Sequence, residues 1–199
     1  MNRKRIVTVV FPIISVMCLF ISVCNLWGQP GPRVFEGSMS GGGSIFTGED
    51  DLWVPPGTHL TNSFDLHCDS FKQPNNLQVD VHLPNGASGR FHLDELQFAW
   101  CWDDPDINPK PPTAPFDSYY GQGIGRYNGE PGYCADWTFT DAGEPGTNDR
   151  VRSMRIWKPR VTGNCSLEES FLFSIYLEPG HALTFGNHQA RKENAGSQE

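Results

Sequence analysis

One segment of the chain concentrates oxygen-bearing side chains within nine residues. Asp141, Glu144, Asn148 and Asp149 lie in Asp-Ala-Gly-Glu-Pro-Gly-Thr-Asn-Asp, where two glycines permit a tight path. Calcium takes about six to eight oxygen ligands, often from flexible loops. The segment therefore predicts a calcium site completed by backbone carbonyls and water. The alternative is an acidic hairpin loop whose Asp and Asn side chains cap backbone amides, because the spacing matches no EF-hand.

A second acidic run, Asp103-Asp104-Pro105-Asp106, opens a proline-rich loop that extends to Pro115. Its carboxylates could join the acidic segment in one patch, or could simply be solvated. Glycoside hydrolysis uses two carboxyl groups at a fixed separation across a cleft. A secreted hydrolase is therefore a third functional hypothesis, and it requires facing carboxylates with raised pKa values.

Aromatic side chains form the third set with chemical potential. Trp100 and Trp102 flank Cys101 and share the face opposite to it, and Tyr119 and Tyr120 follow the proline-rich loop. Flat aromatic faces can stack on the C–H face of a sugar ring, although most such side chains pack in cores. We expect these four residues to form a ligand-binding platform, and we assign Trp137 to the core because of the alternation around it.

The histidines and glycines give no catalytic signature. No His-x-x-x-His spacing is present, and no Ser–His–Asp triad can be proposed from the order of these residues. The glycine-rich run from Gly121 to Gly125 is followed by Arg-Tyr-Asn-Gly and not by a helix. This context excludes a dinucleotide cradle and favours a twisted edge strand or a bulge.

The first residues predict export. Arg3, Lys4 and Arg5 precede an apolar run from Ile6 to Val23, the layout of a secretory signal peptide. We expect cleavage after Cys24 or Gly28, with an uncleaved anchor as the alternative. The full chain has a formal charge of −8, and loss of the three leading cations would leave −11. Such a surface repels phosphate backbones and anionic lipids, so nucleic acid is excluded as a partner.

Four cysteines lie beyond the leader: Cys68, Cys101, Cys134 and Cys165. An even number in an exported chain predicts disulfides. Three pairings are open, and we favour Cys68–Cys101 with Cys134–Cys165 because sequential pairing closes the shortest loops. No two of these cysteines are close together in sequence, which argues against zinc.

The elements that must position these residues are strands. Apolar and polar residues alternate over four segments, which predicts strands with one buried face: residues 60–68, 77–83, 135–140 and 171–177. Residues 150–157 are also predicted to form a strand, although its faces are mixed. Turn signals such as Asn128-Gly129 separate them. One helical turn is expected at 93–97. We predict an all-β fold: a single antiparallel β-sandwich, with a β-barrel as the alternative, and long Pro/Gly-rich loops. The expected divisions are a signal peptide (1–28), a flexible lead-in (29–40), the domain (41–186) and a polar tail (187–199).

A family resemblance covers about residues 41 to 192. It is carried by a set of short segments that occur in this order: Gly41–Phe46, Phe64–Asp69, Pro74–Leu77, Arg90–Leu93, Ala114–Asp117, Gly125–Gly129, Trp137–Gly146 and Gly186–Ala190. The chain resembles the post-COAP-1 type of domain, found in bacterial secreted proteins. The resemblance implies export, a β fold and no catalytic residues to transfer. It also implies the Cys68–Cys101 pair, while Arg191 replaces a histidine usual in the family.

We therefore expect a secreted or cell-surface module that is non-catalytic and calcium-stabilised, and that binds a cell-surface glycan or protein. A carbohydrate-binding domain is the alternative. We expect no nucleic-acid partner and no membrane contact beyond the signal sequence.

Overall fold

The computed structural model describes residues 35–51, 53–107, 114–146, 148–161, 163–165 and 171–192, with only the backbone for 177–179. The predicted signal peptide and residues 29–34 of the lead-in lie outside these residues. The described chain contains no helix and is built of nine strands: β1 (Ser38–Phe46), β2 (His59–His67), β3 (Asn76–His82), β4 (Ser88–Trp102), β5 (Ser118–Tyr127), β6 (Glu130–Thr140), β7 (Arg150–Trp157), β8 (Phe173–Ala182) and β9 (Phe185–Arg191). The all-β prediction is confirmed.

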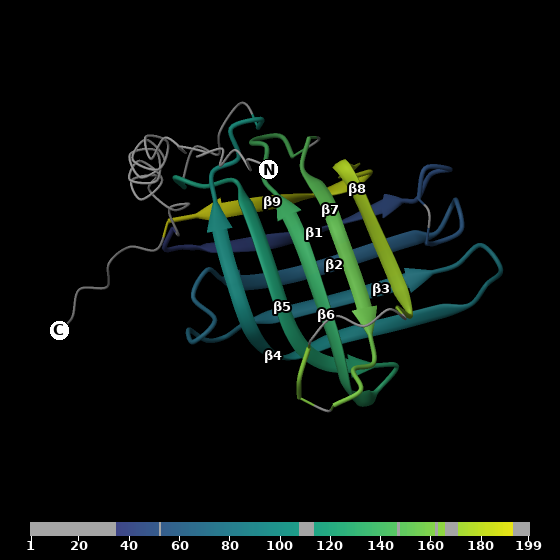
Figure 1. Ribbon diagram of the computed structural model, residues 1–199. Helices are drawn as coiled ribbons and strands as arrows, with labels where there is room; N and C mark the ends of the chain where they lie inside the picture. The colour runs from purple at the N-terminus through teal and green to yellow at the C-terminus, as the bar shows by residue number, and fades with distance from the viewer. Residues whose placement is uncertain are drawn as a thin grey trace, which may run out of the picture. The chain divides into compact units, whose positions relative to one another are not determined.

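The strands form one antiparallel sheet in the order β8-β7-β6-β5-β4-β3-β2-β1-β9. This sheet curls into a half-barrel, so that β5 to β8 cross in front of β9, β1, β2 and β3 (Figure 1). Its two edge strands, β8 and β9, are consecutive in the chain and are joined by only Leu183 and Thr184. The amide of Thr184 donates to the carbonyl of Ser44 in β1, which holds the two edges near each other at this corner.

The curl is made in β4, which belongs to both halves of the sheet. Residues 88–92 pair with β3, and the whole strand from Phe91 onward pairs with β5. Register shifts between Leu93 and Glu95 and between Leu96 and Phe98 bend the strand, as β-bulges do. The predicted helical turn at 93–97 is therefore wrong: these residues form a bulged corner.

The core lies between the two halves. Phe64 of β2 stacks on Phe139 of β6 with ring centroids 4.4 Å apart, and Trp137 is fully buried as predicted. The disulfide Cys68–Cys101 joins the end of β2 to β4, with 5.5 Å between the Cα atoms. The apolar periods in the sequence therefore correspond to the inward faces of the strands.

The glycine-rich segment is β5, a central strand and not the predicted edge strand. Its glycines are required because large side chains lie directly over it. A Cβ atom on Gly121 would stand 2.5 Å from the ring of Trp137, and one on Gly125 would stand 2.6 Å from the ring of Phe91. Glycine here provides space for core side chains from neighbouring strands.

The predicted polar tail also differs from the structure, because residues 187–191 belong to β9. His188 and Ala190 are fully buried, while the residues between them are more exposed. The alternation is present but carried by few apolar residues, which is why hydrophobic periodicity missed it. In the described part of the chain, no helix suited to crossing a membrane occurs.

Candidate functional site

The outer surface of β4 and β5 carries a group of aromatic rings that we call the aromatic face: Phe98, Trp100, Trp102 and Tyr120. Trp100 and Trp102 point outward from β4 while Cys101 between them is buried. Their ring centroids are 5.2 Å apart and the rings are tilted by 37°. Tyr120 is directly opposite Trp100 on β5 and meets Phe98 edge to face at 5.9 Å. Phe98 remains 50% exposed, so the group is not fully used in packing.

Tyr119 does not belong to this face. It is fully buried and its hydroxyl donates to the carbonyl of His67 at 3.1 Å. Consecutive residues in a strand point to opposite sides, so Tyr119 and Tyr120 could not both join one platform. Its assignment to the ligand site is corrected here: Tyr119 is a core residue, whereas Trp100, Trp102 and Tyr120 are brought together.

A buried ion pair lies next to the aromatic face. Arg155 of β7 donates to Asp136 of β6, with 2.7 Å from Nε to Oδ1 and a second bond from the other guanidinium nitrogen to Oδ2. Asp136 is fully buried, and burial raises its pKa while Arg155 opposes that shift. Burial and the Asp136 charge raise the pKa of Tyr120 to about 12, so this phenol is neutral. The sequence analysis missed the pair, although alternation around Trp137 places Asp136 on the outer side.

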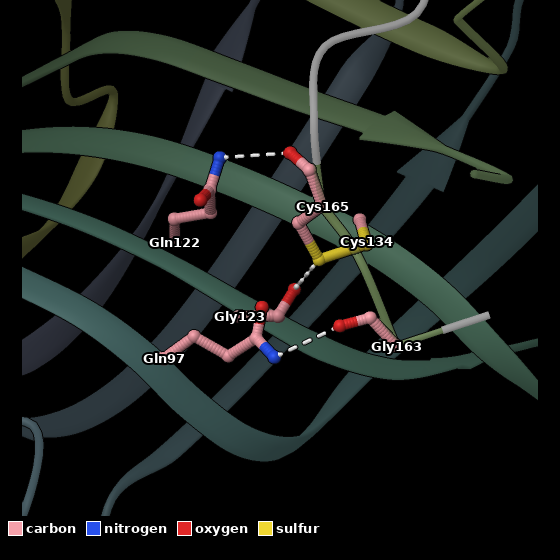
Figure 2. Close-up of a disulfide and its surroundings, with 6 residues drawn as sticks. All are labelled: Gln97, Gln122, Gly123, Cys134, Gly163 and Cys165. Carbon is pink, nitrogen blue, oxygen red and sulfur yellow. Dashed lines mark hydrogen bonds between the residues drawn. A yellow bond between two sulfur atoms is a disulfide. The ribbon is translucent and has the colours of Figure 1, made fainter. Parts of the chain in front are cut away.

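The disulfide Cys134–Cys165 fixes a loop on the outer surface beside these residues (Figure 2). Gln122 donates to the carbonyl of Cys165 at 3.2 Å, and Gln97 donates to that of Gly163 at 3.4 Å. Gln122 lies opposite Phe98 on one neighbouring strand and opposite Asp136 on the other. The loop is therefore anchored directly beside the aromatic face.

A small second core supports this loop. Cys134, Trp157 and Cys165 are buried together, with Ile124 and Phe171 packed against them. The rings of Trp157 and Phe171 meet edge to face at 5.9 Å. Both pairings that we favoured, Cys68–Cys101 and Cys134–Cys165, are present. One crosses between the halves of the sheet and the other builds the border of the aromatic face.

The acidic segment forms a different structure, which we call the acidic clasp: Asp141, Glu144 and Asp149. The carboxylate of Asp149 accepts the amides of Ala142 at 2.8 Å and His188 at 2.6 Å. That of Asp141 accepts the amides of Gly143 at 2.9 Å and Ala190 at 2.7 Å. All four oxygens of these two buried side chains therefore hold backbone amides.

The clasp attaches to β9, which pairs with no strand other than β1. The carboxylates of Asp149 and Asp141 take two amides of β9 where a neighbouring strand would otherwise supply carbonyls. The exposed Glu144 adds Oε1, which accepts from the side chains of Asn187 and Gln189 at 3.1 Å each. The clasp thus covers a strand edge, a part of a sheet that must be protected from unwanted pairing.

The predicted calcium ligands are only partly brought together by this arrangement. Asn148 is exposed, while Asp141 and Asp149 turn inward to the amides. Among the described residues, no group of three or more His, Cys, Asp or Glu side chains is placed to hold a metal ion. Amide capping by the acidic loop, the alternative in the sequence analysis, accounts for both buried carboxylates.

The aspartates of the proline-rich loop lie at the same end of the sheet. The carbonyl of Asp117 accepts the amide of Asp141 at 2.8 Å, and its carboxylate accepts the amide of Asp104 at 2.9 Å. Asp104 also pairs with Arg152 of β7. The two acidic regions therefore converge through Asp117, which the sequence analysis did not single out.

Burial shifts the protonation of this end of the sheet. Desolvation raises the pKa of Asp149 to about 7, against the two amide hydrogen bonds, and the charges of Asp141 and Glu144 add to the rise. Desolvation also raises the pKa of Asp117 to about 6. His188 is fully buried and its Nδ1 lies 3.0 Å from the carbonyl of Thr140, so Nδ1 carries the proton. Burial lowers its pKa to about 4.

These groups do not form a recognisable catalytic arrangement. The carboxylates with raised pKa bind amides and hydroxyls of their own chain, and His188 packs against the rings of Phe64 and Phe139. His181 pairs with Asp51 at 2.9 Å, which attaches β8 to the loop after β1. Each contact joins elements of the fold. No family model matches the chain, and neither the curated proteins nor the solved structures contain a significant match.

Proposed function

We propose that this protein is an extracytoplasmic, non-catalytic binding module whose ligand surface is the aromatic face. The observation that carries the proposal is a group of neighbouring rings, the half-exposed Phe98 and the partly exposed Trp100, Trp102 and Tyr120, placed beside a segment anchored by its own disulfide. Aromatic side chains bury large areas when they can. Rings left at a surface, beside a segment anchored by a disulfide, are characteristic of a recognition site.

The carboxylates of the acidic clasp support a non-catalytic role, because they are bound by the chain's own amides. Asp141 and Asp149 are saturated by backbone amides, so neither offers a free oxygen to a substrate. A hydrolase would need two such groups facing each other across a cleft. We therefore assign the acidic residues to the fold and the aromatic residues to the ligand.

A carbohydrate-binding domain is the second candidate, favoured by one further observation. Gln122 and the Arg155–Asp136 pair lie beside Tyr120 and Phe98. The partly exposed amide of Gln122 and guanidinium of Arg155, the latter held in place by the buried Asp136, lie next to aromatic rings and suit a ligand with both hydroxyl groups and an apolar C–H face. A cell-surface protein remains the competing ligand class.

The test is a binding screen with matched variants. The purified domain is applied to a glycan array and to an array of extracellular proteins, and hits are measured by tryptophan fluorescence. We expect Trp100→Ala and Phe98→Ala to weaken binding at least about tenfold while Trp53→Ala, an exposed ring outside the aromatic face, leaves it unchanged. Variants of the aromatic face that bind like the wild type would contradict the proposal.

The sandwich architecture and the export of the protein are also proposals. We infer that the two halves of the curled sheet act as a sandwich, since Phe64 and Phe139 stack across them and Cys68–Cys101 links them. Two disulfides are consistent with an oxidising compartment outside the cytoplasm. Export through residues 1–28 and membership of the post-COAP-1 type remain predictions, and N-terminal sequencing of the exported protein tests the first.

A further inference from the structure

A cleft separate from the aromatic rings lies at the bulged corner of β4. It has a volume of about 400 Å³, within the range of about 300–1,000 Å³ of small-molecule sites. Six residues line it: Ser70, Phe71 and Gln73 from the loop between β2 and β3, and Glu95, Leu96 and Gln97 from the corner. The cleft therefore exists because the sheet bends at this point.

The loop that supplies Phe71 is held by several contacts. Cys68 at its start is bonded to Cys101, the amide of Phe71 donates to Asp69 at 3.0 Å, and Asn75 accepts the amide of His67 at 2.8 Å. The Phe71 side chain nevertheless remains 94% exposed. A phenyl ring kept in water on an anchored loop contributes little to the fold and is available for a ligand.

The lining residues restrict the ligand class. None of the six residues that line the cleft is a cation, and Glu95 brings a carboxylate, so the lining disfavours an anionic ligand such as a phosphate or an acidic sugar. Lys72 lies between Phe71 and Gln73 in the sequence but is not one of the lining residues. Leu96 is buried, so Phe71 is the only large apolar surface offered and a lipid chain would gain little. A hydroxyl, two amides and a carboxylate remain, and these exchange hydrogen bonds with hydroxyl groups.

We propose that this cleft binds a neutral sugar ring. Phe71 stacks on the C–H face of the ring, the Glu95 carboxylate accepts from its hydroxyls, and the amides of Gln73 and Gln97 both donate and accept. The inference rests on the proposed binding role and names the ligand class, but it places a sugar in a cleft other than the aromatic face.

Gln97 connects the two surfaces. It lines the cleft and also donates to Gly163, in the loop beside the aromatic face, as Figure 2 shows. It occupies the bulge between Leu96 and Phe98. An oligosaccharide longer than one ring could therefore extend from Phe71 toward Phe98 along the corner.

The experiment is an NMR titration of the ¹⁵N-labelled protein with cellotriose, maltotriose and tri-N-acetylchitotriose, with trigalacturonate as the acidic comparison. We expect at least one neutral trisaccharide to shift the amide signals of Ser70–Gln73 and Glu95–Gln97, and trigalacturonate to bind at least about tenfold more weakly. Phe71→Ala should weaken binding at least about tenfold and Glu95→Gln several-fold. Phe185→Ala, which removes another ring that is 75% exposed, should bind normally.

The outcomes separate this inference from the proposed function. Shifts confined to Trp100, Trp102 and Tyr120 would overturn the cleft as a sugar site while supporting the aromatic face. Shifts at the cleft that Trp100→Ala leaves intact would support the cleft alone. Unshifted signals at Ser70–Gln73 with all three neutral sugars at millimolar concentration, or normal binding by Phe71→Ala, would overturn the inference.

Discussion

The acidic clasp and the aromatic face differ in whether their side chains are available to a ligand. In the clasp, Asp141 and Asp149 are buried and every carboxylate oxygen holds an amide of the same chain. On the aromatic face, Phe98 is half-exposed and the other three rings are partly exposed. The most polar segment of the protein thus closes the fold, while an apolar group is left for solvent or a ligand.

This contrast shows that residue type alone does not separate structural from binding roles. A carboxylate next to unpaired backbone amides is used by the fold, because an unsatisfied buried amide is costly. The backbone amides of His188 and Ala190 lie on the free edge of β9, and the carboxylates of Asp149 and Asp141 are their acceptors. On the outer side of the curled sheet the aromatic rings are only partly covered, and Phe98 remains 50% exposed. The position in the topology decides the role of each residue.

The largest expected effect comes from breaking the clasp with Asp149→Ala. The amides of Ala142 and His188 would lose their acceptor, and each unsatisfied buried amide costs about 1–3 kcal/mol. We expect urea unfolding to give a stability loss of about 2–6 kcal/mol, with ligand binding unchanged in the folded fraction. Glu144→Ala, which removes the exposed member of the clasp, is the control and should cost much less. Equal losses for the two variants would contradict this account of the clasp.

The next effect comes from removing the Cys134–Cys165 disulfide with the double Cys→Ala variant. Removing a disulfide typically costs about 2–4 kcal/mol. Here we also expect faster hydrogen exchange at Gly163 and Cys165 and weaker ligand binding, because this bond fixes the border of the aromatic face. If stability falls while binding is unaffected, the loop held by Cys134–Cys165 has a structural role only. The rings would then form the ligand surface without the loop.

The sequence predicted the fold better than the roles of its polar residues. Alternation identified β2, β3, β6 and β8, because their inward residues are apolar, and β7 was predicted as a strand although its faces are mixed. It failed at β9, where inward positions hold His188 and Ala190. The strand is held by contacts with Asp149 and Asp141, which lie 39 and 49 residues earlier in the chain than their partners. Such long-range pairing leaves no local pattern.

The sequence also predicted only part of the candidate site. Trp100 and Trp102 were placed correctly by their spacing around Cys101. Applying the same alternation to Tyr119 would have assigned it to the core. The Asp136–Arg155 pair and the role of Gln122 depend on which strands are neighbours, and one sequence does not contain that information.

A smaller effect is expected from pH, because folding changes the proton affinity of buried groups. Between about pH 4 and 6, Asp149 and Asp117 are protonated in the folded chain but ionised in the unfolded chain, so folding takes up protons. His188 opposes this, since it is neutral when folded and protonated when unfolded. The net uptake by these three groups is about one proton, so stability should fall as pH rises from about 4 to 6, by about 1.4 kcal/mol per pH unit. Burial also raises the pKa values of Asp141 and Asp136, which adds to the fall.

Urea unfolding at half-unit pH steps measures this slope, and NMR of the Asp149 carboxyl carbon measures its titration directly. A stability that rises steadily over the same range would show that the amide hydrogen bonds outweigh burial. The clasp carboxylates would then be ionised throughout. The aromatic face should contribute nothing to the slope, since Tyr120 stays neutral far above this range.

The smallest expected effect is that of calcium on the melting temperature. The sequence favoured Asp141, Glu144, Asn148 and Asp149 as ligands, and this stays a prediction that melting curves can decide. Because the oxygens of Asp141 and Asp149 already accept four amides, a cation would have to displace those bonds to bind. We therefore expect the same midpoint in excess calcium and in excess chelator. A higher midpoint in calcium, abolished by Asn148→Ala, would mean that the clasp rearranges around an ion, and the acidic region would then be a binding site as well as a closure of the β9 edge.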